Sequence, residues 1–403
     1  MLFVPKNNLA VGRHHIVRRA SAVSLADFSA ARREATRPLA FRGPDFDRQF
    51  DDTTLVYEAV DIGVAQTVLF APPFFNLADE IARTEFHQGS RRLNAEIRPF
   101  DRHAQIWLRG SAEGMDIRAT GPLGDFTIRA APDDRAIFRD RRVIFTMSKD
   151  NPIEWILDWV RFNRDIHGAD AVLIYDNGST AYDGATLSAA LQTVSGIERS
   201  AVVEWPFKYG PQGANSWEHW DSDFCQLGAW EHARWCFLQD ARAAMNSDVD
   251  EFVISKAGRS VFEAAEQSAF GFVRYHGRWI IGVNEPAGPD VADRLPRHRD
   301  FSVLMPPDQR FSWRRGWRDM NRCQPKWTVV PSKCPAHVQW HVHSIASWLP
   351  SRLPTSREFS FRHFREIGSN WKYQRTSRVP FDPSIHRTDA LLTETLTRVA
   401  WAR

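Results

Sequence analysis

Residues 142–179 read RVIFTMSKDN PIEWILDWVR FNRDIHGADA VLIYDNGS, and this stretch decides the expected fold. Residues 143–147 and 171–175 are continuous apolar runs, typical of strands buried on both faces of a parallel sheet. Between them, Asn151-Pro152-Ile153-Glu154 combines an N-cap asparagine, proline at the first helical position and a capping-box glutamate. Gly168 stands where a left-handed residue commonly closes a helix. The pattern predicts a strand, a helix and a second parallel strand, which together form a βαβ unit.

The rest of the chain extends this unit into an α/β domain. We expect a helix over residues 221–237, whose apolar side chains form one stripe, and strands at 271–275 and 327–330. Earlier residues hold short strand-like segments bounded by turn residues, at 54–60, 67–71, 104–108 and 126–130. The sequence thus predicts a β-rich, sandwich-like N-terminal module over residues 1–140, a Rossmann-like α/β domain over 141–380 and a C-terminal tail over 381–403.

The composition is that of an ordinary globular protein. The chain has 403 residues, 43% of them hydrophobic, which is enough to form the cores of two domains. A net charge of +3 is too small to indicate nucleic-acid binding. Residues 291–378 nevertheless contain 17 Lys and Arg against 6 Asp and Glu, so we expect an anionic ligand near this part of the chain.

The cysteines and apolar runs bear on the location of the protein. Cys225, Cys236, Cys323 and Cys334 show neither C-x-x-C spacing nor the density of a disulfide scaffold, so reduced thiols are expected. Residues 1–25 lack the continuous apolar core of a signal peptide, and no run approaches the roughly 20 apolar residues that span a bilayer. We expect a cytoplasmic protein whose contact with a membrane, if it has one, is peripheral.

Two acidic motifs follow segments with the pattern of buried strands. The first, Tyr175-Asp176-Asn177-Gly178-Ser179, ends the βαβ unit. Open α/β sheets bind ligands at the carboxyl ends of their strands, where Asp176 would accept hydrogen bonds from a nucleotide base or ribose. Because Asn-Gly is a common turn dipeptide, a plain Asx-type turn is the alternative.

The second motif is Asp248-Val249-Asp250-Glu251-Phe252, which stands between apolar runs. Asp248 and Asp250 supply the hard oxygen ligands with which Mn²⁺ or Mg²⁺ would hold a diphosphate. A solvated acidic loop is the alternative. Carboxylates between core segments are costly unless a cation pairs with them, which favours a metal site.

Histidines and basic residues downstream extend the expected site. A strand over residues 339–343 would place His341 and His343 on one face, and His363 follows later. A lone histidine is more often structural than a ligand, but beside a carboxylate metal site it becomes a reasonable additional ligand. A cationic patch for the diphosphate, or else a solvated basic surface, would consist of Arg362, Arg365, Lys372 and Arg375.

Sixteen tryptophans are many for a chain of this length. Most must be core residues, but sugar rings present C–H faces that stack on aromatic rings. Trp313 and Trp317 stand among Arg314, Arg315 and Arg318 and are the better candidates for an exposed groove that binds a glycan acceptor.

Seven motifs stand in order along residues 142–378: Lys149-Asp150-Asn151, Asp158-Trp159, Tyr175-Asp176-Asn177-Gly178-Ser179, Asp248-Val249-Asp250-Glu251-Phe252, Lys326-Trp327-Thr328-Val329-Val330-Pro331, His343-Ser344 and His363-Phe364-Arg365. Together they resemble glycosyltransferase family 92 and related family-2-like enzymes of the GT-A fold. The usual opening of that family is K-N-E followed by E-W and Y-H. This chain has Lys149-Asp150-Asn151 and Phe162-Asn163 in those places.

The resemblance implies a GT-A domain that uses a UDP-sugar, often UDP-galactose, with a divalent metal, usually manganese. Asp248 and Asp250 would hold the metal, with His343 or His363 completing its ligands. The nucleotide sugar would contact Lys149, Asp176, Asn177, Arg362, Arg365 and Lys372. An inverting displacement also needs a carboxylate base on the acceptor hydroxyl, for which Glu285 and Asp319 are the candidates.

The leading hypothesis is therefore a metal-dependent glycosyltransferase that transfers a hexose to a glycan or polysaccharide. One alternative is a sugar-phosphate nucleotidyltransferase, although no Gly-rich phosphate loop follows the first strand, where residues 146–150 read TMSKD. The other is a non-catalytic carbohydrate-binding protein, whose glycan binding would survive both metal removal and Asp248→Ala.

Overall fold

The computed structural model describes residues 8–10, 14–211, 221–284, 294–313, 316–369 and 379–401. The expected βαβ unit is present as β14 (Arg142–Ser148), α3 (Ile153–His167) and β15 (Ala171–Asp176). The two strands are parallel, with Ser148 beside Asp176. Gly168 closes α3 in the left-handed conformation at φ 70°, which confirms the predicted end of the helix.

The predicted capping box at the start of α3 is wrong. Pro152 rather than Asn151 occupies the N-cap position, and no side chain caps the helix. The side-chain amide of Asn151 donates a hydrogen bond to Ser148 Oγ at 2.9 Å instead. Asn151 therefore ties the loop to the end of β14, and α3 begins one residue later than the sequence indicated.

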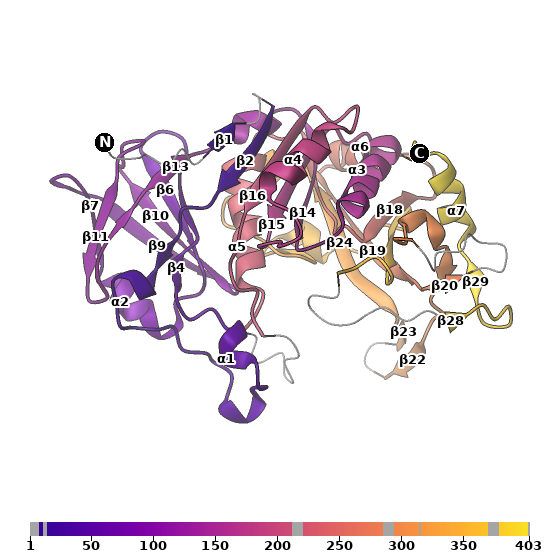
Figure 1. Ribbon diagram of the computed structural model, residues 1–403, viewed down its shortest axis with the longest axis horizontal. Coiled ribbons are helices and arrows are strands. Elements are labelled where there is room, and N and C mark those ends of the chain that lie inside the picture. The colour runs from indigo at the N-terminus through magenta and orange to yellow at the C-terminus, as the bar shows by residue number, and fades with distance from the viewer. Residues whose placement is uncertain are drawn as a thin grey trace.

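A 12-stranded sheet forms the larger part of the fold, and its central five strands, β2-β16-β15-β14-β17, are parallel (Figure 1). The next strand, β24, runs antiparallel to β17, and β19 follows it. Beyond β19, the sheet continues through β21 to β29, while β27 joins β19 to β18. The bounds are β1 (Asn8–Ala10), β2 (His15–Arg19), β16 (Arg199–Glu204), β17 (Ala243–Asn246), β18 (Glu251–Ser255), β19 (Phe272–Ile280), β21 (Val303–Leu304), β24 (Arg322–Val329), β27 (Phe359–Phe364) and β29 (Arg387–Thr388). The strands expected at residues 271–275 and 327–330 lie in β19 and β24.

Alternation along the parallel strands gives the sheet two apolar faces. Ile144 and Val172 belong to one cluster, which α3 and α4 (Gly184–Gln192) cover. Phe145 and Leu173 belong to the other, which α5 (Phe224–His232) and part of the N-terminal module cover. The helix expected over residues 221–237 is thus present as α5 and a six-residue π-helical continuation over Ala233–Leu238. Helices on both sides of a mixed sheet with a parallel central part define a mixed α/β fold.

The N-terminal module consists of a five-stranded sheet, β13-β5-β6-β10-β9, and a four-stranded sheet, β12-β11-β7-β8. Leu69 and Ile106 of the first sheet and Phe126 of the second share one apolar cluster. The bounds are β5 (Glu58–Asp61), β6 (Gln66–Ala71), β7 (Glu85–Gln88), β8 (Arg91–Arg92), β9 (Asn94–Phe100), β10 (His103–Arg109), β11 (Ile117–Gly121), β12 (Gly124–Ile128) and β13 (Ala130–Pro132). One early segment joins the other part of the fold, because β2 pairs in parallel with β16 of the large sheet.

Buried polar groups connect the N-terminal module to the large sheet. Glu58 of β5 accepts from Arg18 of β2, with Nη2 and Oε1 3.0 Å apart, and its other oxygen lies 2.8 Å from His232 Nε2. His232 Nδ1 lies 2.6 Å from the hydroxyl of Tyr175 in β15. Burial by itself raises the pKa of Glu58, but Arg18 and His232 lower it below its ordinary value. The Glu58 carboxylate is thus kept charged where the N-terminal module meets the large sheet.

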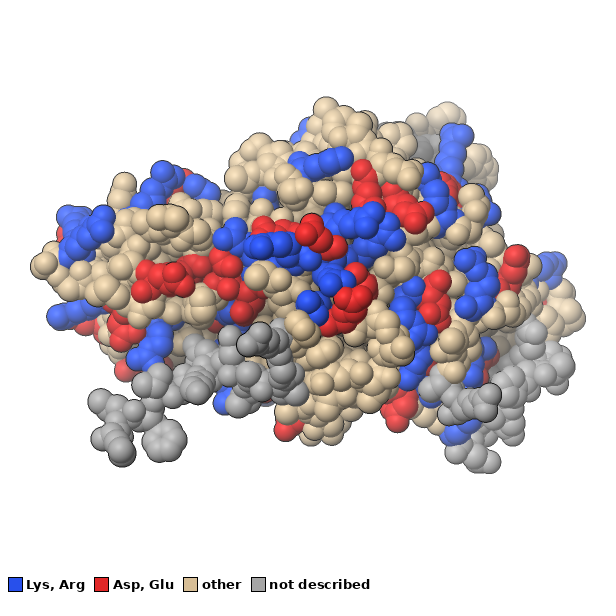
Figure 2. Space-filling model, turned by 90° about the horizontal axis from the view of Figure 1, so that it is seen from above, with Lys and Arg blue, Asp and Glu red and all other residues tan. Residues whose placement is uncertain are grey.

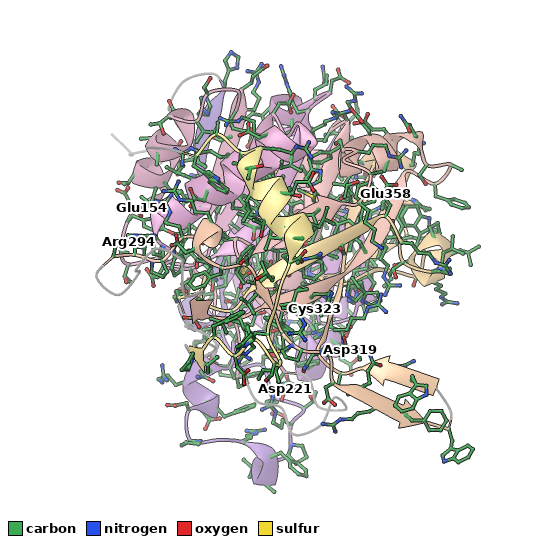
Figure 3. All side chains as sticks on the ribbon, turned by 90° about the vertical axis from the view of Figure 1, so that its right-hand side faces the viewer. Glu154, Asp221, Arg294, Asp319, Cys323 and Glu358 are labelled. Carbon is green, nitrogen blue, oxygen red and sulfur yellow. The ribbon has the colours of Figure 1, made fainter. Side chains whose placement is uncertain are left out.

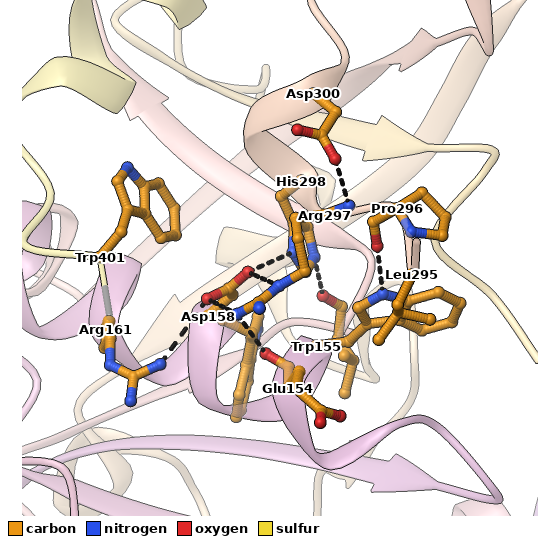
Figure 4. A network of polar contacts seen from close by, with 12 residues as sticks. Glu154, Trp155, Asp158, Arg161, Leu295, Pro296, Arg297, His298, Asp300 and Trp401 are labelled. Carbon is orange, nitrogen blue, oxygen red and sulfur yellow. Dashed lines mark hydrogen bonds and ion pairs between the residues drawn. The ribbon is translucent and has the colours of Figure 1, made fainter. Parts of the chain in front are cut away.

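A second buried carboxylate, Asp158, anchors α3 to the short helix η6 (His298–Asp300) and the segment before it (Figure 4). Arg297 donates to both its oxygens, at 2.7 and 2.5 Å. Trp155, one turn earlier on α3, donates its indole N–H to the carbonyl of Pro296 at 2.6 Å. The Asp158-Trp159 motif therefore has a structural part in holding this segment on α3.

The surface and the helices of the described residues bear on partners. On the face seen in Figure 2, basic and acidic side chains lie interspersed. Among the described residues, none of the helices has both the length and the apolar character needed to cross a membrane. All four cysteines are free, and three of them, Cys225, Cys236 and Cys323, are buried.

Candidate functional site

The candidate site lies at the ends of β14 and β17, two adjacent parallel strands whose connections run in opposite directions across the sheet. From β14 the chain continues through α3 to β15, towards one edge of the sheet, whereas from β17 it continues to β18, towards the other edge. In open α/β sheets, ligands bind outside the carboxyl ends of strands at such a point. Lys149 follows β14, Asp176 ends β15, and Asp248 and Asp250 follow β17. The two acidic motifs therefore lie at the same edge of the sheet, as the sequence indicated.

A cavity of about 630 Å³ opens at this edge beside the second motif. Its walls come from widely separated parts of the chain, including the N-terminal module (Arg102), α5 (Gln226, Leu227), the acidic turn (Asp248, Glu251), β19 (Trp279), the start of β24 (Cys323, Gln324), residues 341–344 and β27 (Phe361, His363). The mixture of apolar, aromatic and ionisable groups is typical of small-molecule sites. Asp176 is not among the residues that line this cavity.

A lysine from another strand pairs with the acidic turn, a role that the sequence did not indicate. Lys326 of β24 is buried, and its Nζ lies 2.8 Å from Asp248 Oδ2 and 3.2 Å from Glu251 Oε2. Burial by itself lowers the pKa of Lys326, but the two carboxylates raise it above its ordinary value. The ammonium therefore stays charged and offsets part of the acidic charge that a metal was expected to neutralise.

Glu251 is the most enclosed carboxylate of the turn. Its Oε2 accepts the backbone N–H of Asp248 at 3.0 Å in addition to the contact with Lys326. Burial raises the pKa of Glu251 to about 7, and the neighbouring carboxylates of Asp248 and Asp250 raise it too, against the opposite effect of Lys326. Glu251 thus changes its protonation state close to neutral pH.

His363 contacts Asp250 through pairing between strands. β27 is antiparallel to β18, which places His363 beside Glu251, and its Nε2 lies 2.9 Å from Asp250 Oδ2. The ring of His363 stacks on Trp279 of β19, with centroids 4.0 Å apart and planes 23° apart. Trp279 therefore fixes the orientation of the imidazole against the acidic turn.

His341 and His343 both line the cavity, but the strand predicted for them is wrong. The strand β25 covers only Gln339–Trp340, and residues 341–344 form a loop before β26 (Ile345–Ala346). The carbonyl of His341 accepts the indole N–H of Trp327, and the carbonyl of Val342 accepts the side-chain amide of Asn246. The side chains of Trp327 and Asn246 thus bond to backbone carbonyls that would otherwise accept hydrogen bonds from a neighbouring strand.

His343 has the environment of a neutral ligand. Its Nδ1 lies 3.1 Å from the carbonyl of Pro325, which favours a proton on Nδ1 and leaves the Nε2 lone pair available. The side chain is exposed at the cavity surface, yet the enclosing protein, and then Lys326, lower its pKa to about 4. His343 is therefore uncharged at neutral pH.

The possible ligand atoms are of the types that bind a divalent cation, but their arrangement fits one less clearly. Asp248 and Asp250 supply oxygen, and His343 or His363 supplies nitrogen, a set that suits Mn²⁺. Within the described ranges, no cluster of three or more His, Cys, Asp or Glu side chains is spaced to hold a metal ion. Asp248 is paired with Lys326 and Asp250 with His363. A metal at this turn would therefore have to compete with both contacts.

The first motif is a turn in which the carboxylate of Asp176 finds its hydrogen-bond donors locally. Asp176 accepts the backbone N–H and the hydroxyl of Ser179, the hydroxyl at 2.5 Å, and burial raises its pKa. The side-chain amide of Asn177 donates to the carbonyls of Trp205 and Phe207, at 2.8 and 2.9 Å. Asn177 thus holds the chain after β16, and Asp176 keeps the contacts of the plain Asx-type turn.

The basic residues expected at the diphosphate divide into three groups. Arg362 forms a buried ion pair with Asp389, beside α7 (Ala390–Thr397). This pairing corrects its predicted role, because neighbouring residues of a strand point to opposite faces and His363 takes the cavity side. Lys149 and Arg365 are partly buried, and the carbonyl of Lys149 accepts the hydroxyl of Ser369. Lys372, with Arg375, falls outside the described residues.

Of the two predicted catalytic bases, Asp319 is the one that the structure describes, and it does not line the cavity. Glu285 falls outside the described residues. Asp319 ends β23 (Gly316–Asp319), and its Oδ1 accepts the backbone N–H groups of Asp308 and Asn321, each at 3.0 Å (Figure 3). Asp319 therefore closes the base of a hairpin and does not line the cavity.

Sequence reasoning missed a charged pair that also lines the cavity. Arg102, in the turn between β9 and β10, lies 3.3 Å from Asp223, which precedes α5. Both residues have positive φ, 55° and 66°, a conformation that costs free energy in residues other than glycine and often marks functional sites. Nothing local in the sequence signals this pair, because it joins residues 121 positions apart.

A scan of protein-family models and a search of curated proteins found no match to this chain. The function must therefore be argued from the cavity itself.

Proposed function

We propose that this protein is a metal-dependent glycosyltransferase that transfers a hexose from a UDP-sugar to a glycan or polysaccharide acceptor, with inversion. The observation that carries the proposal is the place of Asp248 and Asp250. Their turn follows a central parallel strand at the switch point of an α/β sheet, and it borders a cavity of about 630 Å³. The GT-A domain over residues 141–380 is part of the same proposal.

Asp248 and Asp250 would hold Mn²⁺ or Mg²⁺, with His343 or His363 as the nitrogen ligand. When bound, such an ion neutralises the charge that grows on the departing diphosphate. The neutral ring of His343 offers its Nε2 to the cation without the loss of a proton. The Lys326 ammonium, 2.8 Å from Asp248, adds a fixed positive charge below the leaving group.

Asp223 is the best-placed general base for the acceptor hydroxyl. The described acidic side chains that line the cavity are Asp223, Asp248 and Glu251. Asp248 is assigned to the metal, and Glu251 is buried against Lys326. Asp223 also lines the cavity, and its ion pair with Arg102 holds the carboxylate in place. This assignment is preferred to Asp319, which does not line the cavity, while Glu285 lies outside the described residues.

The remaining polar groups would shape the sugar site. The hydroxyl of Tyr209 donates to Gln226 Oε1 at 2.7 Å, and both residues line the cavity. Asp176, two strands from β17, would contact the ribose or base at the side of the cavity. Strand spacing puts it about 10 Å from the end of β17, a distance that a nucleoside diphosphate can span.

The test is a donor screen with purified protein. We expect hydrolysis of a UDP-sugar, and a rise in melting temperature with UDP and Mn²⁺, in the wild type but not in Asp250→Ala. Asp116→Ala, which changes an exposed ion pair of the N-terminal module, is the matched control and should behave as wild type. A wild type that neither hydrolyses UDP-, GDP- or CMP-sugars nor gains stability from any of them with Mn²⁺ would contradict the proposal.

One observation favours a second function, a non-catalytic carbohydrate-binding protein. Lys326 already neutralises part of the acidic turn, so the cavity can persist without a metal. Glycan binding that is unaffected by chelator and by Asp248→Ala would favour this function over catalysis.

A further inference from the structure

A two-stranded hairpin exposes large apolar side chains next to the cavity. β22 (Gln309–Ser312) and β23 (Gly316–Asp319) pair with each other and, among the described strands, with no other. Figures 1 and 3 both show this hairpin projecting beyond the rest of the fold. Trp313 is 95% exposed and Trp317 is 70% exposed, while Phe311 and Met320 are more than half exposed.

Such exposure calls for a partner. Full burial of one large apolar side chain is worth roughly 1.5–3 kcal/mol, and soluble proteins seldom leave several together in water. The three described rings form a group, because Phe311 lies 5.5 Å from both Trp313 and Trp317. Four apolar side chains on and next to one short hairpin thus make a local patch that the other described residues leave exposed.

The shape of this patch argues against a sugar platform. The ring of Phe311 is inclined by 76° to Trp313 and by 58° to Trp317, so the rings do not share one flat face for a sugar to stack on. Phe311 and Met320 carry no group that could hydrogen-bond a hydroxyl. The patch suits an apolar environment without a fixed shape better than it suits a sugar ring.

The charge around the patch is positive. Residues 309–321 contain four Arg and one Asp. Arg318 lies on β23 next to the exposed Trp317, and its own side chain is exposed. Tryptophan settles at the level of lipid headgroups, and arginine beside it contacts anionic headgroups while its stem stays in the apolar layer.

We propose that the β22–β23 hairpin binds the surface of an anionic lipid bilayer. Trp313, Trp317 and Phe311 enter the headgroup region, and Arg318 pairs with lipid phosphates. Two aromatic anchors with basic neighbours give reversible, peripheral binding that weakens as salt is added.

The hairpin also relates this contact to the cavity. Asp319 closes its base, and three residues later β24 begins with Arg322, Cys323 and Gln324, the last two of which line the cavity. Bilayer binding would hold the cavity close to the membrane surface, which suits a lipid-linked glycan acceptor. The identity of the acceptor rests on the proposed function, whereas the bilayer contact does not.

The test is co-sedimentation of the full chain with vesicles of phosphatidylcholine, with and without phosphatidylglycerol, and without any nucleotide sugar. We expect binding to the anionic vesicles, and at least tenfold weaker binding for the variant that carries Trp313→Ser and Trp317→Ser. Arg318→Ala should weaken binding about fivefold, and only with anionic vesicles. Leu39→Ser with Val64→Ser, two exposed apolar positions of the N-terminal part, is the matched control and should bind as wild type.

Three outcomes would overturn the inference. The wild type would fail to sediment with any vesicles, or the double tryptophan variant would sediment as wild type. In the third outcome, vesicles do not bind, and binding of a soluble oligosaccharide or of a second copy of the chain depends on Trp317. Asp250→Ala should bind vesicles normally, so loss of donor turnover and loss of membrane binding are separate results. Equal melting temperatures of the wild type and the tryptophan variant exclude misfolding as the cause.

Discussion

The turns after β15 and β17 are both acidic, yet they obtain their partners in different ways. Asp176, at β15, is bound by Ser179 of the same turn. Asp248, after β17, meets Lys326 of β24, and Asp250 meets His363, a residue 113 positions later. The carboxylate of Asp176 thus finds its partners within its own turn, whereas distant strands supply the partners of Asp248 and Asp250.

This difference separates a turn that would at most contact the nucleoside from a turn that would take part in the reaction. The carboxylate of Asp176 is already satisfied by its own turn, so the fold does not depend on a ligand there. The turn after β17 instead gathers carboxylates, a buried ammonium and two imidazoles beside a cavity, at a cost that a purely structural turn does not require. The predictions below test whether the two turns behave as differently as their contacts indicate.

The largest effect should follow Lys326→Met. The substitution leaves the buried carboxylate of Glu251 without its cation, and breaking a buried ion pair in this way costs about 3–5 kcal/mol. Urea denaturation should show this loss, while Lys333→Met, at an exposed lysine, should change little. Adding Glu251→Gln to Lys326→Met should recover part of the stability. Equal denaturation midpoints for Lys326→Met and wild type would show that Lys326 does not stabilise the turn after β17.

The next effect distinguishes the two turns in catalysis. Asp250→Asn should lower kcat for the UDP-sugar by about 10²–10³, since it weakens the binding of the metal ion that would stabilise the departing diphosphate. Asp176→Asn should mainly raise KM for the donor, because its proposed contact is with the nucleoside in both ground and transition states. Steady-state kinetics measure the split. The same loss of kcat in both variants would make the two turns equivalent.

Titration of Glu251 gives a third difference, in the dependence of stability on pH. Its folded-state pKa is raised to about 7 from an ordinary 4.5. Between these values the folded state holds more protons than the unfolded state, so the free energy of unfolding should fall as pH rises from about 4.5 to 7. Lys326 stays charged throughout this window because its pKa is raised. Glu251→Gln should flatten this part of the profile, and an unchanged slope would contradict the assignment.

The same contrast explains how far the sequence could predict the molecule. The βαβ unit over residues 142–179 follows from local apolar runs, helix signals and Gly168, and the structure has it at that place. The pairing of β2 with β16 could not be predicted, because a five-residue strand carries no sign of a partner 185 positions later. Local rules also failed at His341 and His343, where side chains from β17 and β24 took the backbone acceptors.

The site shows the same limit. Asp248, Asp250 and His363 could be proposed because the acidic motif is compact and the resemblance includes the later histidine. Lys326 could not, although it stands in a quoted motif, because its role depends on the antiparallel register that sets Trp327 beside Asn246. Arg102 and Asp223 meet only because the N-terminal module contacts α5, which a linear pattern does not encode.

The smallest effect should come from Ser179→Ala, in the turn after β15. The substitution removes the hydroxyl that donates to Asp176 and accepts the backbone N–H of Asp150, but it keeps the backbone N–H of residue 179, so the loss should be about 1–2 kcal/mol of unfolding free energy. The pKa of Asp176, already raised by burial, should rise further, because a hydrogen bond to its ionised form is lost. Donor turnover should remain near the wild-type value. Thermal denaturation with parallel kinetics checks both results, and Ser29→Ala, at another serine-capped turn, is the matched control. A large loss of turnover without a loss of stability would show that the turn after β15 also belongs to the reaction, and that partners drawn from its own segment do not make a carboxylate structural.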